Sequence, residues 1–215
     1  MTRTHWAAVA AVVLALLFAG AATVASAGGA PAEGTPDAAS AEAGFARDMS
    51  VHHQQAVEMS FIVRERTDDE EVRRLAYDIA NTQANQRGMM LGWLDLWGLP
   101  KIEAGAEPMA WMRGAGGSGH GGHGAAAEEG RLMPGMATKA ELRELGGLSG
   151  KEAEVRFLQL MINHHNGGVA MAEGCVERCE VTVERNLART MVLGQRSEVE
   201  LMVDMLRARG AQPLV

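Results

Sequence analysis

The sequence lacks any run or stripe of clustered Lys and Arg. Its 20 basic and 27 acidic side chains give a formal net charge of −7. Binding to nucleic-acid phosphates depends on clustered basic side chains, so this charge balance excludes a nucleic-acid partner.

The common catalytic motifs are also missing. The chain contains no G-x-S-x-G elbow, no H-E-x-x-H pair and no phosphate-binding P-loop. Nothing in the sequence therefore requires an enzyme, although a redox-active metalloprotein stays open as an alternative. Sustained period-two alternation between hairpin turns is absent too, and this argues against β-structure.

Hydrophobic residues make up 47% of the 215 residues, which is enough for a packed core and argues against wholesale disorder. Aromatic residues are scarce at 4%, whereas Met occurs 14 times and Gly 26 times. A chain of this length holds one ordinary domain with appendages.

The N-terminus has the layout of a secretory signal peptide. A short polar start is followed by the apolar stretch Trp6–Gly20, and small residues then end in Ala25-Ser26-Ala27. We expect cleavage before Gly28 and a secreted, periplasmic or cell-envelope protein in an oxidising compartment. The alternative is an uncleaved membrane anchor, because Trp6–Ala27 is about long enough to span a bilayer.

Composition and helical periodicity divide the rest of the chain. We predict a flexible linker, a first helical hairpin, a crossover containing Gly, Met and His, and a short helix followed by a second hairpin. The corresponding ranges are 1–27 for the signal peptide, then 28–40, 41–100, 101–135 and 136–215, with 41–215 forming one domain.

Capping patterns place the helix ends. Capping boxes are predicted at Thr67 with Glu70, Thr138 with Glu141 and Ser149 with Glu152, and helix stops at Gly98 and Gly210.

An internal repeat relates the two hairpins. Shifting the sequence by 112 positions aligns the halves without a gap, so that His52-His53 meets His164-His165 and Gly98 meets Gly210. Each half is a helix pair with an apolar stripe that it cannot cover alone. We therefore predict an all-α, ferritin-like four-helix bundle, built from two repeated antiparallel helix hairpins and joined by a long Gly-rich crossover.

The histidine pairs lie on otherwise apolar helical stripes with methionine on either side. The candidate metal ligands are His52, His53, Met49 and Met59 in the first copy, and His164, His165, Met161 and Met171 in the second. Buried imidazoles are costly unless they are hydrogen-bonded or bound to metal. The simpler alternative is a packed core in which the histidines are satisfied and the methionines fill gaps.

The donor types favour copper. Imidazole suits several transition metals, and thioether sulfur suits Cu(I) in particular. A ferritin-type di-iron site would need Glu-x-x-His, which does not occur in the chain, and structural zinc would need closely spaced Cys and His ligands. Another transition metal stays open.

Three further features are of interest. Gln83 and Gln195 interrupt equivalent apolar faces and either orient the imidazoles from across each hairpin or serve helix pairing. His120 and His123 form an auxiliary metal-binding tract or lie in a plain connector. Cys175 and Cys179 are candidates for a disulfide, with a Cu(I) dithiolate or a redox pair as rivals.

The sequence resembles the exported bacterial family called domain of unknown function 305. The resemblance runs from Phe45 to Gly210 and is carried by MSVHHQQAVEMS, MINHHNGGVAMA, QANQRGMMLGWL and QRSEVELMVDML. It implies a ferritin-like helical fold, and some members bind copper in the periplasm. The eight histidines and methionines named above match the family motif. The chain departs from it at Ser50-Val51, where Ile-Pro is common, and at Gly167-Gly168.

We therefore expect an exported protein whose partner is a metal ion and which sequesters or chaperones copper without catalytic turnover. A structural or interaction module is the further alternative, and a homo-oligomer stays open.

Overall fold

The computed structural model describes residues 34–113 and 131–214. The predicted signal peptide, its cleavage position before Gly28, and the histidines His120 and His123 lie outside these residues. In the part of the chain that is described, no helix is both long and apolar enough to cross a membrane.

The described residues form α-helices and one short 3-10 helix, with no strand among them. The all-α prediction is confirmed. The elements are α2 (Ala41–Arg64), α3 (Glu70–Leu96), η1 (Ala110–Met112), α5 (Lys139–Gly147), α6 (Gly150–Arg178) and α7 (Thr182–Ala208).

The helix starts agree with the capping patterns at one site and differ at two. At α5 the predicted box is present, because Thr138 accepts a hydrogen bond from the Glu141 N–H while the Glu141 carboxylate accepts one from the Thr138 N–H. The box at Thr67 is wrong, since Asp69 caps α3 by accepting from the Val72 N–H. Ser149 precedes α6 as predicted, but its hydroxyl makes no capping bond.

The Thr67 hydroxyl is used elsewhere. It donates to the Glu154 carboxylate of α6 over 2.6 Å and accepts from the Asp69 N–H over 3.0 Å. Arg209 at the end of α7 pairs with both Glu154 and Asp69. One polar cluster thus ties the start of α3 to α6 and α7, and a local capping pattern cannot reveal such a long-range contact.

Gly98 and Gly210 follow the ends of the two outer helices as predicted. Each has a φ of +68°, in the left-handed region that glycine tolerates best. The next residue then donates back into the last turn, Leu99 to the Leu94 carbonyl and Ala211 to the Leu206 carbonyl. Both helices therefore end in the same Schellman-type arrangement.

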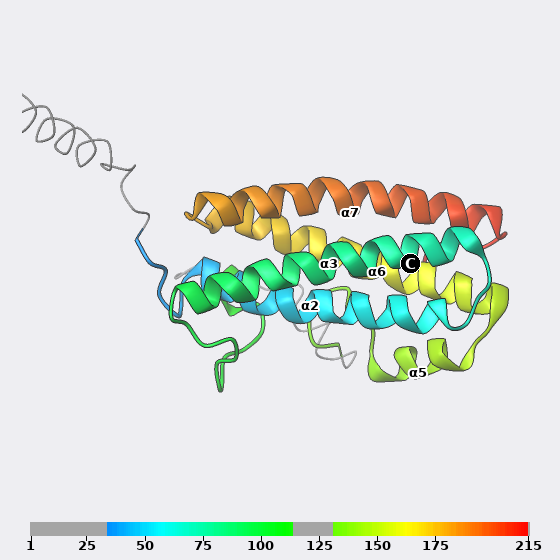
Figure 1. Cartoon of the computed structure of the whole chain (residues 1–215), viewed down its shortest axis with the longest axis horizontal. Coiled ribbons are helices and arrows are strands. Elements are labelled where there is room, and N and C mark those ends of the chain that lie inside the picture. Colours follow the sequence, from blue (N-terminus) through cyan, green and yellow to red (C-terminus); the bar gives the residue numbers. More distant parts are fainter. Residues whose placement is uncertain (1–33, 114–130, 215) are drawn as a thin grey trace, which may run out of the picture. The chain divides into compact units, whose positions relative to one another are not determined.

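The long helices pack as pairs (Figure 1). Helix α2 lies along α3 and α6 lies along α7, while α2 and α6 pack against each other and join the pairs. The short helix α5 contacts α2 and α6.

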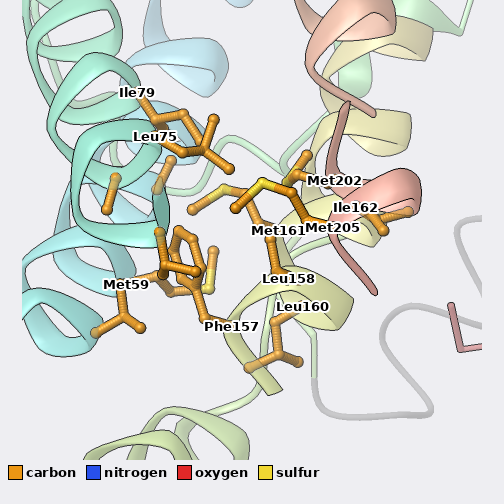
Figure 2. Packing of buried hydrophobic residues seen from close by; sticks show 14 of the residues in the cluster. Met59, Leu75, Ile79, Phe157, Leu158, Leu160, Met161, Ile162, Met202 and Met205 are labelled. Atoms are coloured by element: carbon orange, nitrogen blue, oxygen red, sulfur yellow. The ribbon is translucent and has the colours of Figure 1, made fainter. Parts of the chain in front are cut away.

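Two apolar clusters fill the interior. The first includes Met59 of α2 and Met161 of α6, and Figure 2 shows Met161 beside Met202 and Met205 of α7. The second includes Met49 and Met171. Since an early residue of α2 shares a cluster with a late residue of α6, the two helices run in opposite directions. The histidine pairs, which lie between these methionines in each helix, fall between the two clusters.

The segment that links α3 to α5 is anchored to α2 at two places. The Asp48 carboxylate accepts from the Met109 N–H over 2.7 Å and from the Trp111 indole N–H over 2.9 Å. Further along, Gln55 makes a reciprocal pair with the Ala137 backbone, at 2.6 and 2.9 Å. Met109 and Met133 of the crossover, and Met136 directly after it, are buried in the second cluster.

Candidate metal centre

The four paired histidines are completely buried where α2 meets α6. The rings of His52 and His164 are in contact, with centroids 3.8 Å apart and planes tilted by 36°. The two helices thus bring together residues that are 112 positions apart in the sequence.

The second histidine of each pair is held from across its own hairpin. His53 Nε2 lies 2.8 Å from the Gln86 Oε1 atom, and His165 Nε2 lies 2.6 Å from a Glu198 carboxylate oxygen. Gln86 and Glu198 are also 112 positions apart, so the internal repeat extends to these partners.

The first histidine of each pair breaks the repeat. His164 Nε2 lies 2.9 Å from the His52 carbonyl, whereas His52 Nε2 lies 3.2 Å from the carbonyl of Pro134 in the crossover. One imidazole is therefore held by the opposite helix and the other by the connecting segment.

Two glycine residues allow the crossover to approach α6 closely. A Cβ atom at Gly167 would lie 2.1 Å from the Pro134 carbonyl oxygen, and one at Gly135 would lie 2.2 Å from the Asn163 oxygen. Gly135 also has a φ of +77°. Although the Gly167-Gly168 pair departs from the family motif, α6 continues through it. The missing side chain at Gly167 makes room for the Pro134 segment that binds His52.

The partners of Nε2 decide which nitrogen carries the proton. A backbone carbonyl only accepts hydrogen bonds, so neutral His52 and His164 must be protonated at Nε2. Their Nδ1 atoms then carry free lone pairs. None of the four Nδ1 atoms has a hydrogen-bond partner among the described residues. Such bare, buried nitrogens are suited to binding a metal ion.

Burial favours the neutral form of His52, His53 and His164. It lowers the pKa of His52 to about 4, and burial together with the neighbouring His52 lowers the pKa of His53 to about 3. Burial also moves the pKa of His164 well below its ordinary value, helped by His52 and His165. Neutral imidazole is the form that binds metal.

The predicted methionine ligands are all completely buried. Met49 precedes His52 by three residues, as Met161 precedes His164, so each lies on the same helix face as its histidine. Met59 and Met171 lie beyond the pairs in the opposite clusters.

Gln83 and Gln195 do not orient the imidazoles. Both are buried, and their amide atoms have no hydrogen-bond partner in the described part of the chain. That role belongs to Gln86 and Glu198, which lie three residues further along the same helix faces. The sequence does not show which of two residues one turn apart meets the imidazole, because the register between paired helices is not visible in a single stripe.

Cys175 and Cys179 form a disulfide at the end of α6. Their sulfur atoms and a carboxylate oxygen of Glu184 all lie within 4.8 Å of one another. In the described residues this is the one group of three His, Cys, Asp or Glu side chains brought so close. No three of the four imidazoles form such a group among the described residues. Sequence reasoning missed Glu184, whose charged type gave no sign of its complete burial.

The described helices of this all-α protein therefore pack as two pairs around two buried histidine pairs. The chain belongs to the family described as domain of unknown function (DUF305), whose model matches residues 42–206. A comparison with curated proteins finds no match.

Solved structures give the same family. A DUF305 protein of Streptomyces coelicolor, a candidate secreted protein, is 63% identical, with 83% of this chain and 99% of that chain covered and a TM-score of 0.73. A DUF305 fragment of Deinococcus radiodurans is 33% identical, with 75% and 92% covered and a TM-score of 0.60. CopM in its Cu(I)-bound form is 19% identical, with 79% and 96% covered and a TM-score of 0.56, a likeness that shows the fold.

Proposed function

We propose that this protein is exported and sequesters or chaperones copper, through the two histidine pairs and their flanking methionines and without catalytic turnover. The observation that carries the proposal is the set of four buried imidazoles with unpartnered Nδ1 atoms between α2 and α6.

A metal ion accounts for a cost that packing alone leaves unexplained. A buried polar atom without a partner costs about 1–3 kcal/mol. Four such nitrogens lie between two apolar clusters, while the Nε2 atoms of the same rings are fixed on oxygen acceptors. Fixing one nitrogen on an acceptor orients the ring and leaves the other nitrogen for a metal.

The donor set favours copper over zinc or iron. Among the described residues, the imidazoles form no group of three with a further His, Cys, Asp or Glu side chain, and Met49 and Met161 lie one turn before the first histidine of each pair. Imidazole combined with thioether suits Cu(I). CopM, which shares the fold, has been solved with Cu(I), Cu(II) and silver bound.

Export is supported by the signal-peptide layout of residues 1–27 and by the 63% identity to a candidate secreted protein. We further propose that the two helix pairs and their crossover follow the ferritin-like arrangement.

Competition for Cu(I) against a chromophoric chelator tests the function. We compare the mature chain with the His52→Ala/His164→Ala variant, and use His120→Ala/His123→Ala as a control that removes the same number of histidines. Far-UV circular dichroism confirms that each variant is folded. We expect the first variant to bind Cu(I) at least about tenfold more weakly, equivalent to about 1.4 kcal/mol, and the control to match the wild type. Equal Cu(I) affinity in the wild type and the His52/His164 variant would overturn the proposal.

A further inference from the structure

The turn between α6 and α7 encloses a second group of metal-ligand side chains, separate from the histidines. Cys175, Cys179 and Glu184 come from the end of one helix and the first turns of the next. All three are buried, with exposed fractions of 0%, 2% and 0%. Their ligand atoms lie within 4.8 Å of one another.

Glu184 is the unusual member of this group. Both of its carboxylate oxygens are buried and have no hydrogen-bond partner among the described residues. Its neighbours include the Glu42 carboxylate, which accepts from the Glu180 and Val181 N–H groups at the start of α7. A buried carboxyl group beside another acid and without a donor costs folding free energy. Glu184 lies in the first turn of α7, where the helix dipole favours an acid, but its oxygens make no capping bond among the described residues.

We propose that Cys175, Cys179 and Glu184 form a thiol-gated site for a divalent cation of the zinc type, which is closed while the disulfide is present and opens when it is reduced. The site lies outside the histidine centre and does not depend on the proposed copper function.

The gating step is thiol–disulfide exchange with a dithiol reductant. One reductant thiolate attacks a protein sulfur, the Cys175–Cys179 bond breaks, and the second reductant thiol resolves the mixed disulfide. Two electrons pass to the protein, two cysteine thiols form and the reductant leaves as its own disulfide. The incoming cation then displaces the two thiol protons and any proton on Glu184.

Charge favours a dication over Cu(I) at this site. Two thiolates and one carboxylate carry three negative charges, of which a dication leaves one uncompensated and a monocation leaves two. Uncompensated charge in an apolar cluster is costly, and Cys175 and Cys179 belong to the second apolar cluster. Zinc also accepts thiolate and carboxylate ligands together.

Titration with Co²⁺ as a spectroscopic probe tests the proposal. Thiolate-to-cobalt charge transfer produces near-ultraviolet absorption that imidazole ligands do not produce, so the signal reports this site and not the histidines. The mature chain is titrated in oxidised form and after reduction with a phosphine, and Zn²⁺ is then added to displace the cobalt. We expect one Co²⁺ per reduced chain, none in the oxidised chain, and release by Zn²⁺.

Three variants make the test specific. We expect Cys175→Ser to abolish the charge-transfer band and Glu184→Gln to weaken Co²⁺ binding at least about tenfold, whereas the matched control Glu180→Gln, an exposed acid four residues earlier, leaves it unchanged. Circular dichroism of the reduced chain is recorded first, and loss of helix on reduction would overturn the proposal because the site needs α6 and α7 in place. A reduced, folded chain without the band would also overturn it. The proposal would also be overturned if the two sulfurs bound Cu(I) with an affinity that Glu184→Gln does not change.

Discussion

The buried histidines make the stability of the metal-free protein depend on pH. His52 and His53 have pKa values of about 4 and about 3 because of burial, compared with about 6.5 in an unfolded chain. Below the pKa of the unfolded chain, these two imidazoles therefore bind protons in the unfolded state but not in the folded state. The contribution to stability is complete above about pH 6.5 and is lost as the pH falls toward the folded values.

We expect the free energy of unfolding of the metal-free chain to fall from about pH 7 to about pH 5, by about 1–2 kcal/mol for each of these two histidines. Urea unfolding followed by circular dichroism measures it. His53→Gln should flatten this dependence, because it removes one group that titrates in the unfolded state alone. A free energy that stays constant over this range would contradict the burial of neutral imidazoles.

For single residues, the sequence predicts the burial of the histidines well and their hydrogen-bond partners poorly. The repeat and the apolar stripes locate all four imidazoles in the interior. They do not distinguish Gln83 from Gln86, because both residues lie on the same helix face, and the relative shift of two packed helices decides which one meets His53. The Pro134 carbonyl could not be predicted, since backbone atoms leave no pattern in a sequence.

Among the elements, the crossover depends on glycine at its contact with α6. A methyl group at Gly167 would lie 2.1 Å from the Pro134 oxygen and 2.6 Å from the Pro134 carbonyl carbon. Both are backbone atoms, so the segment must move away, and His52 then loses its acceptor.

We expect Gly167→Ala to destabilise the protein by about 1–3 kcal/mol, despite the higher helix propensity of alanine. Gly194→Ala in α7 is the matched control. A Cβ there meets nothing within 4 Å, so the same exchange should stabilise the fold by up to about 1 kcal/mol. Thermal unfolding measures both. If the two substitutions shift stability in the same direction, the close approach of the crossover is not the reason for the glycine.

The helix ends show what local patterns predict at this scale. Gly98, Gly210 and the Thr138–Glu141 box behave as their sequences suggest, because each is completed by residues within one turn. Thr67 does not, because its hydroxyl reaches Glu154, which is 87 positions away. A local capping pattern fails to predict the structure where the side chain hydrogen-bonds to a residue far away in the sequence.

For the whole molecule, the internal repeat explains why some contacts of the two histidine pairs are equivalent and others are not. His53 with Gln86 is matched by His165 with Glu198, as expected for two copies of one helix pair. The crossover has no second copy, and it is this segment that makes His52 differ from His164. The contacts of His53 and His165 therefore follow the repeat, whereas those of His52 and His164 do not.

Anomalous diffraction from a crystal of the copper-loaded mature protein, recorded on both sides of the copper absorption edge, tests the central claim most directly. We predict that the anomalous peak lies between α2 and α6, within bonding distance of Nδ1 atoms of the histidine pairs and of methionine sulfur. A copper-loaded crystal whose anomalous peaks all lie elsewhere, with the four imidazoles free of metal, would contradict the account.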